Sequence, residues 1–152
     1  MSAQSKTKSK KKKSLSGLSK QELLRAYRVM QTGRLLDKKM LTLLKQGKSF
    51  FHIGTSGHEA MQVALGLAMK GGYDWFYPYY RDLTFSLTIG MTPRDVLLQF
   101  LSRKDDPASG AKQMPAHYGR RDLRIITQSS PTGTQFLQAV GCAQGNVKEG
   151  TD

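Results

Sequence analysis

The chain has 152 residues, a formal net charge of +13 and 38% hydrophobic residues, which suits one globular domain with its own core. No run of about 18 apolar residues occurs, so no transmembrane helix is predicted. The single cysteine, Cys142, excludes an internal disulfide. Because small residues surround Cys142, we expect a buried thiol in a reducing, cytoplasmic compartment.

A basic tail precedes the predicted domain. The first thirteen residues contain six lysines and no acid: Lys6, Lys8, Lys10, Lys11, Lys12 and Lys13. Such a run predicts a disordered, solvated segment over residues 1–17, and it resembles neither a secretory signal nor a mitochondrial transit peptide. A contact with nucleic acid or another anionic surface is the alternative that these charges leave open. Residues 18–152 form the predicted domain.

The first half of the domain is predicted to be mostly helical. Ser19 and Glu22 have the spacing of a capping box, and apolar residues at helical spacing predict one helix over 20–46, ended by Gly47. A second helix is expected to start at residues 57–60 and to stop at the glycines of 71–72. Residues 74–80 resemble a strand, although Pro78 favours a short edge or an extended loop.

The second half alternates helices with irregular segments. Residues 81–89 are predicted to be helical, and Thr92 with Pro93 predicts another helix that runs to about residue 102. A long polar loop covers 103–124, a short strand is expected at 125–126, and a polar turn at 129–135 leads into a helix to about 148. Small residues recur in that last helix, so we expect close packing. This order of elements predicts the α/β class.

Several common site signatures are missing from the sequence. His58 and Glu59 begin a pattern like that of zinc proteases, but Gln62 stands where the second histidine ligand is required. No dinucleotide-binding, phosphate-loop or paired-cysteine motif occurs either. The sequence therefore predicts neither a zinc protease, nor a nucleotide site of those types, nor a redox cysteine pair.

Two polar segments remain as candidates. In residues 79–82, Arg81 follows a predicted strand beside two tyrosines, where a guanidinium can fork onto phosphate oxygens; the alternative is a surface arginine paired with Asp82. Residues 129–135 form a turn before a helix N-terminus, which favours anions, and the turn also gathers oxygen ligands that suit a cation. A capped turn with solvated serines is the alternative there.

Five segments in order resemble the alpha chain of thiamine-diphosphate-dependent 2-oxo acid dehydrogenases, and the resemblance is strongest to the branched-chain type. It extends over about residues 20–150 and depends on the segments Arg34–Asp37 with Gln46–Lys48, Gly57–Ala60, Asp74–Asp82, Gln113–Gly119 and Ser129–Gly141. Two positions depart from the family pattern. Thr132 stands where a larger apolar residue is typical, and Asp82 stands where Glu is common.

The resemblance implies a thiamine-diphosphate-binding fold, of which this chain holds the N-terminal helices and the first strands of a parallel sheet. Tyr80 and Arg81 would hold the diphosphate, and Ser130 with the Thr132 backbone would contact the pyrimidine end. His117 would lie in a loop near the substrate. A potassium ion would be bound by the Ser129 and Pro131 carbonyls and by the Thr134 and Gln135 side chains. Magnesium ligands are expected beyond residue 152, and the resemblance identifies no catalytic residue within the chain.

The activity implied is oxidative decarboxylation of a 2-oxo acid, expected to be branched and similar to 3-methyl-2-oxobutanoate, with acyl transfer to a lipoyl group. The expected partners are a beta-type chain or domain and a lipoyl transacylase core. Without them the chain should be inactive and its apolar helices partly exposed. The alternatives are a pyruvate or acetoin dehydrogenase alpha chain, a non-enzymatic module that binds nucleic acid through its lysines, and a complete small assembly protein.

Overall fold

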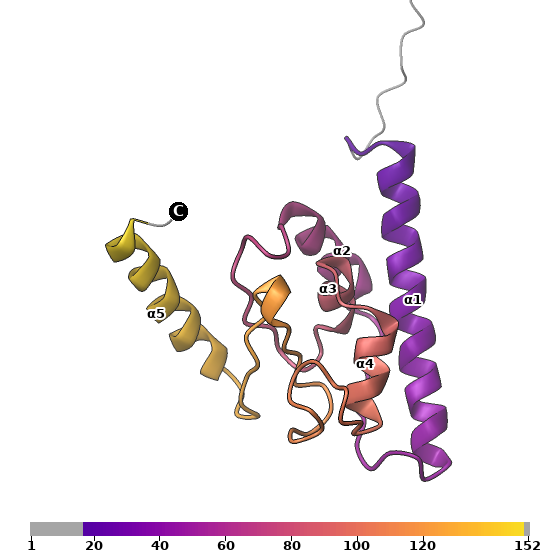
Figure 1. The fold of residues 1–152 in the computed structure, drawn as a ribbon. Helices are drawn as coiled ribbons and strands as arrows, with labels where there is room; N and C mark the ends of the chain where they lie inside the picture. Colours follow the sequence, from indigo (N-terminus) through magenta and orange to yellow (C-terminus); the bar gives the residue numbers. More distant parts are fainter. Residues whose placement is uncertain (1–16, 151–152) are drawn as a thin grey trace, which may run out of the picture.

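Helix α1 is the longest element of the molecule. A computed structural model describes residues 17–150, and α1 spans Lys20–Lys45 (Figure 1). The predicted capping box is confirmed: Ser19 Oγ accepts from the Glu22 amide at 3.2 Å, and Glu22 Oε2 accepts from the Ser19 amide at 2.7 Å. The chain leaves the helix through Gly47, whose φ of +69° is accessible to glycine at little cost.

Three shorter helices follow at the predicted places. Helix α2 spans Glu59–Ala68, α3 spans Leu83–Thr88 and α4 spans Pro93–Phe100. The predicted caps of α4 are confirmed, since Thr92 Oγ1 accepts from the Asp95 amide at 3.2 Å and Pro93 occupies the first turn. Helix α4 ends before the predicted residue 102, and α2 ends before the glycines that were expected to stop it.

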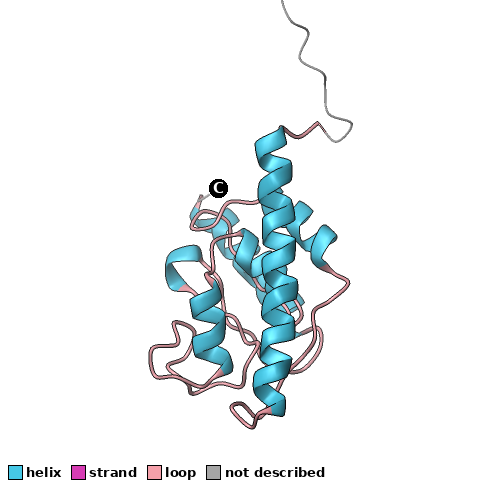
Figure 2. Ribbon diagram, turned by 90° about the vertical axis from the view of Figure 1, so that its right-hand side faces the viewer, coloured by secondary structure: helices cyan, strands magenta, loops and turns pink. Residues whose placement is uncertain are grey.

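The core lies where α1 packs against α2, α3 and α4 (Figure 2). Helix α3 is at its centre: Leu83, Thr84 and Ser86 have no exposed surface. Two glycines allow the helices to approach this closely, because a Cβ on Gly33 would lie 2.5 Å from Thr84 Oγ1 and one on Gly66 would lie 2.6 Å from Thr88 Cβ. The remaining core is aliphatic and aromatic, including Leu36, Met40, Phe76, Phe85, Val96, Phe100, Tyr118 and Ile125.

The predicted strands at 74–80 and 125–126 are reduced to isolated bridges in the described residues, and Ile125 also pairs with Arg120 in antiparallel orientation. Phe76 pairs with Ile125 in parallel orientation, with the Phe76 amide donating to the Arg124 carbonyl at 3.0 Å. Pro78 has no amide to extend this pairing, and Arg124 has a left-handed φ of +56° that bends the chain. Residues 17–150 therefore consist of helices and loops with no strand longer than a bridge, so the sheet of the expected α/β fold is not seen within them.

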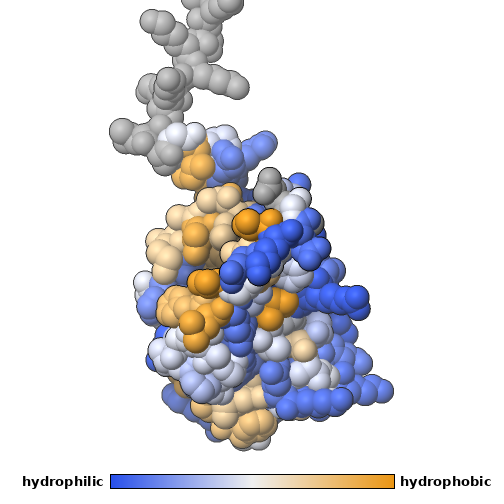
Figure 3. All heavy atoms as spheres, turned by 90° about the vertical axis from the view of Figure 1, so that its left-hand side faces the viewer, coloured by the Kyte–Doolittle hydropathy of each residue, from blue (hydrophilic) through white to orange (hydrophobic). Residues whose placement is uncertain are grey.

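Helix α5, Thr134–Glu149, corrects a second prediction. It has no buried residue, and the expected close packing is absent because no other described helix covers it. Four of its apolar side chains are exposed: Phe136, Leu137, Val140 and Val147. Figure 3, which views the molecule from the α5 side, shows apolar side chains at the surface among hydrophilic ones. Partly exposed apolar helices were expected, and this expectation is confirmed.

Cys142 on α5 is half-exposed rather than buried as predicted. Helix α5 meets the preceding chain where Cys142 and Tyr77 line the same hollow. Burial, together with the neighbouring Cys142 thiol, raises the pKa of Tyr77 to about 12. The small residues around Cys142 therefore do not bury it, since they face no neighbouring helix.

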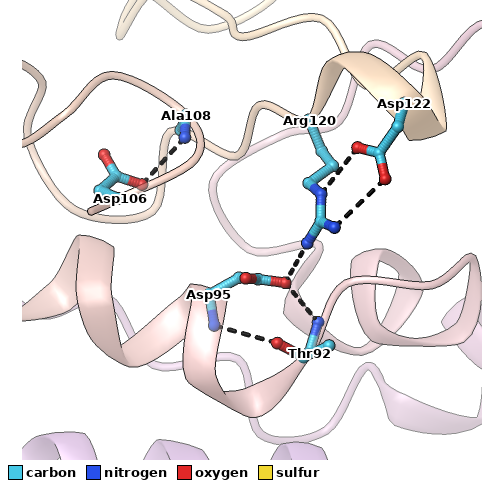
Figure 4. Close-up of polar contacts among 6 residues, drawn as sticks. All are labelled: Thr92, Asp95, Asp106, Ala108, Arg120 and Asp122. Carbon is cyan, nitrogen blue, oxygen red and sulfur yellow. Dashed lines mark hydrogen bonds and ion pairs between the residues drawn. The ribbon is translucent and has the colours of Figure 1, made fainter.

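The predicted irregular loop at 103–124 is held by charged side chains (Figure 4). Arg120 lies between Asp95 of α4, at 2.5 Å, and Asp122, at 2.7 Å, in the short helix η1 that spans Arg121–Leu123. Asp106 Oδ1 accepts from the Ala108 amide at 3.0 Å and closes a turn earlier in the loop. These contacts fix the loop near its start and near its end.

The predicted basic tail with its six lysines lies almost wholly in residues 1–16, outside the described residues, as do residues 151–152. Within residues 17–150, no helix is both long enough and apolar enough to cross a membrane.

Candidate functional site

The two candidate segments meet in space although they are far apart in the sequence. The hydroxyls of Tyr79 and Thr132 lie 3.3 Å apart, a contact across 53 positions of the chain. The rings of Tyr79 and Tyr80 lie against each other, tilted by 37° with their centroids 3.7 Å apart, and their hydroxyls are hydrogen-bonded to each other. The tyrosine–arginine segment and the serine–proline turn therefore share one polar cluster.

His117 joins the same cluster from a third segment. Its Nε2 lies 3.0 Å from Ser130 Oγ, and its Nδ1 lies 3.0 Å from the Met114 carbonyl oxygen. A carbonyl can only accept, so in the neutral ring the proton belongs on Nδ1, and Nε2 accepts from the Ser130 hydroxyl. The His117 carbonyl is fixed in turn by Gln99 of α4, whose Nε2 donates to it at 2.7 Å.

Arg81 is exposed and points its guanidinium at the loop before α2. Its Nη1 donates to the Gly54 carbonyl at 2.6 Å, and the guanidinium carbon lies 5.9 Å from the centre of the Tyr80 ring. Arg81 forms no ion pair with Asp82 in the described residues, which was the alternative for this arginine. The Asp82 carboxylate instead accepts a hydrogen bond from the Tyr79 amide at 2.9 Å. Most N–H donors of the Arg81 guanidinium therefore remain available to a ligand.

Gln62 is a buried residue of this site that sequence reasoning noted only as a missing zinc ligand. Its Nε2 donates to the Arg81 carbonyl at 3.0 Å and to Asp82 Oδ1 at 3.1 Å. Its Oε1 accepts from the amides of Thr84 and Phe85 at 3.1 and 3.2 Å. Gln62 therefore fixes the backbone of Arg81 and caps α3. A usable signal was its position one helical turn after Glu59, on the face that both residues bury.

Burial raises the pKa of Asp82, and the hydrogen bond from the Tyr79 amide acts against this shift without cancelling it. The Asp82 carboxylate faces the Tyr79 amide and Gln62, so its charge is directed into the protein. Arg81 is thus the charged group that the segment presents outward. This arrangement favours an anion at Arg81.

The turn at 129–135 brings together two of the four residues expected to bind a cation. Thr134 Oγ1 donates to the Pro131 carbonyl at 2.9 Å, so a hydroxyl and a carbonyl oxygen are adjacent. Ser129 is exposed and Gln135 is half-buried. Hydroxyl and carbonyl oxygens are ligands that suit hard cations.

The polar cluster has the guanidinium donors of Arg81 at one end and hydroxyl groups at the other. Next to it, between α2 and residues 75–78, lies an apolar cavity of about 250 Å³ lined partly by Met61, Leu65, Trp75, Tyr77 and Asp82. No group of three or more His, Cys, Asp or Glu side chains within residues 17–150 is arranged to hold a metal ion. Arg81 and the hydroxyl groups of the cluster are side chains that can bind an anion.

Comparisons with known proteins identify the family of the chain. Residues 27–152 match the model of the dehydrogenase E1 component family. The chain is 40% identical to the alpha subunit of 2-oxoisovalerate dehydrogenase from Bacillus subtilis, over 90% of this chain and 41% of that protein. It is 35% identical to the protein of the same name from Pseudomonas aeruginosa, over 88% of this chain and 32% of that protein.

A pyruvate dehydrogenase E1 alpha subunit from Mycoplasma pneumoniae is 33% identical over 82% of this chain and 32% of its own length. The chain thus spans about two fifths or less of the length of these three curated relatives. The family match covers most of the chain and includes both segments of the polar cluster. The chain belongs to the dehydrogenase E1 component family.

Proposed function

We propose that the chain is part of the alpha-type subunit of a 2-oxo acid dehydrogenase that uses thiamine diphosphate and acts on branched 2-oxo acids. The observation that carries this proposal is the contact of Tyr79 with Thr132, which joins the tyrosine–arginine segment to the serine–proline turn. The relatives named for 2-oxoisovalerate support a branched substrate, and the pyruvate-named relative makes pyruvate the second candidate.

Different residues of the cluster would contact the two ends of the cofactor. Tyr80 and Arg81 would hold the diphosphate, because a guanidinium with free N–H groups can donate two parallel hydrogen bonds to phosphate oxygens. Ser130 and the backbone of Thr132 would contact the pyrimidine end, with His117 orienting the Ser130 hydroxyl from the loop nearest the substrate. The bound cofactor supplies the nucleophilic carbon and electron sink that decarboxylation of a 2-oxo acid requires.

The turn that contacts the cofactor would be stabilised by a potassium ion. The Ser129 and Pro131 carbonyls and the Thr134 and Gln135 side chains would be its ligands, and the adjacency of Thr134 Oγ1 to the Pro131 carbonyl supports this set. Magnesium ligands would lie beyond residue 152. A beta-type chain or domain would complete the site, and a lipoyl transacylase core would accept the acyl group.

The proposal is tested by Arg81→Ala in the full-length protein assembled with its beta-type partner. Loss of a charge-assisted phosphate contact should raise the KM for thiamine diphosphate about 10- to 100-fold. Arg94→Ala is the matched control, since Arg94 is an exposed arginine on α4 outside the cluster, and it should leave the KM unchanged. An unchanged KM in Arg81→Ala would contradict the diphosphate role. Rates with 3-methyl-2-oxobutanoate and pyruvate distinguish the two substrate candidates.

A further inference from the structure

A buried carboxylate in the middle of α1 gathers the loop that precedes α2. Asp37 is only 8% exposed. Its Oδ1 accepts from the Thr55 amide at 3.2 Å and lies 3.1 Å from His52 Nε2, and its Oδ2 accepts from Ser56 Oγ at 2.8 Å. All three partners belong to residues 52–56, so this one side chain fixes that loop onto α1.

The same loop provides the hydrogen-bond acceptor for Arg81. The Gly54 carbonyl, which accepts from Arg81 Nη1 at 2.6 Å, lies between two of the residues that Asp37 holds. A Cβ on Gly54 would be 3.9 Å from Asp37 Oδ2, so Gly54 lies directly beside the carboxylate. A continuous path of contacts therefore runs from α1 through the loop to the guanidinium.

This path of contacts is expected to affect how tightly Arg81 binds a phosphate, for a physical reason. An exposed arginine has many rotamers, and a guanidinium recognises a phosphate only when its planar fork is correctly oriented. Ordering the side chain before the ligand arrives removes that entropy cost from binding. Core packing alone would not account for a carboxylate at this position, because burying a charge is costly unless its partners compensate.

We propose that Asp37 is a positioning residue for Arg81: by holding residues 52–56, it fixes the Gly54 carbonyl that orients the guanidinium toward the diphosphate. The inference rests on the proposed function, because Arg81 is taken to bind the cofactor. Asp37 itself touches neither cofactor nor substrate. It acts on cofactor affinity and leaves the chemical step unchanged once the cofactor is bound.

The test is Asp37→Asn in the full-length protein with its beta-type partner. The amide keeps the shape of the side chain but replaces one acceptor oxygen with a donor group, so the loop contacts cannot all be kept. The KM for thiamine diphosphate should rise about tenfold, while kcat at saturating cofactor stays within about twofold of wild type.

Asp95→Asn is the matched control for this experiment. Asp95 is a similarly buried carboxylate, 7% exposed, whose partners Thr92 and Arg120 lie outside the candidate site. It should lose stability and leave the KM for the cofactor unchanged. Equal KM changes in the two variants, or a fall in kcat without a change in KM for Asp37→Asn, would overturn the inference.

Two further measurements separate this inference from the proposed function. In the Arg81→Ala background, Asp37→Asn should not raise the KM further; an additional tenfold rise would show that Asp37 does not act through Arg81. If Arg81→Ala alone leaves the KM unchanged, the diphosphate role is wrong, and a crystal structure of the Asp37→Asn protein then decides the positioning role. That structure should lack the contact between Gly54 and Arg81, and its retention would refute the inference.

Discussion

The α1–α4 body and helix α5 share a sequence feature, small residues within helices, but they use it differently. In the body, Gly33 and Gly66 lie against Thr84 and Thr88, where a Cβ would approach to 2.5 and 2.6 Å. On α5, a Cβ at Gly141 would meet nothing within 4 Å. A small residue permits close packing, but it does not supply the neighbour that makes the packing happen.

The largest expected effect comes from filling the tight contact in the body. Gly66→Ala should destabilise the chain by about 2 kcal/mol net, because overpacking a close helix contact outweighs the gain in helix propensity. Gly141→Ala on α5 is the matched variant and should stabilise by up to about 1 kcal/mol through propensity alone. Chemical denaturation measures both. A loss of stability in Gly141→Ala would show that a neighbour covers α5, and it would contradict the difference between α5 and the α1–α4 body.

An intermediate effect is expected from the buried charges that only the body contains. Asp95→Asn should cost about 1–2 kcal/mol, because Asp95 Oδ2 accepts from both the Thr92 amide and Arg120 (Figure 4). Glu149→Gln, which changes an exposed acid at the end of α5, should stay within about 0.5 kcal/mol of wild type. Similar losses of stability in both variants would mean that the burial of Asp95 does not increase the stabilisation that its carboxylate provides.

The smallest effect concerns pH. Burial acts to raise the pKa of Glu59, but hydrogen bonds from its own amide, from Arg34 and from the Gly57 amide outweigh it, so the pKa is lowered from 4.5. Because the folded-state pKa is lowered, the stabilisation is fully present above about pH 4.5 and is lost as the pH falls through the lowered pKa.

Measuring the free energy of unfolding between pH 6 and pH 3 tests this sign. Wild type should lose more stability than Glu59→Gln across that window, because the amide does not titrate. Hydrogen exchange should report the change at the start of α2 and not on α5, which has no such buried acid. Parallel pH profiles for wild type and Glu59→Gln would contradict the assignment.

The features that the sequence predicted directly depend on interactions between residues that are close together in the chain. The capping boxes at Ser19 and Thr92 depend on hydrogen bonds that span three positions, so local residue types specify them. The starts and order of the helices followed from the same signals. The site segments were recognised through resemblance to a family, while the sequence patterns alone left a surface arginine and a solvated turn as alternatives.

Tertiary structure alone decided which residues meet. The contact of Tyr79 with Thr132, the four hydrogen bonds of Gln62 and the path from Asp37 to Arg81 join residues that only packing of the helices brings together. The exposure of α5 and the reduction of two predicted strands to isolated bridges have the same origin. Strand pairing and helix burial require a partner surface, and a local residue pattern cannot specify whether that surface is present.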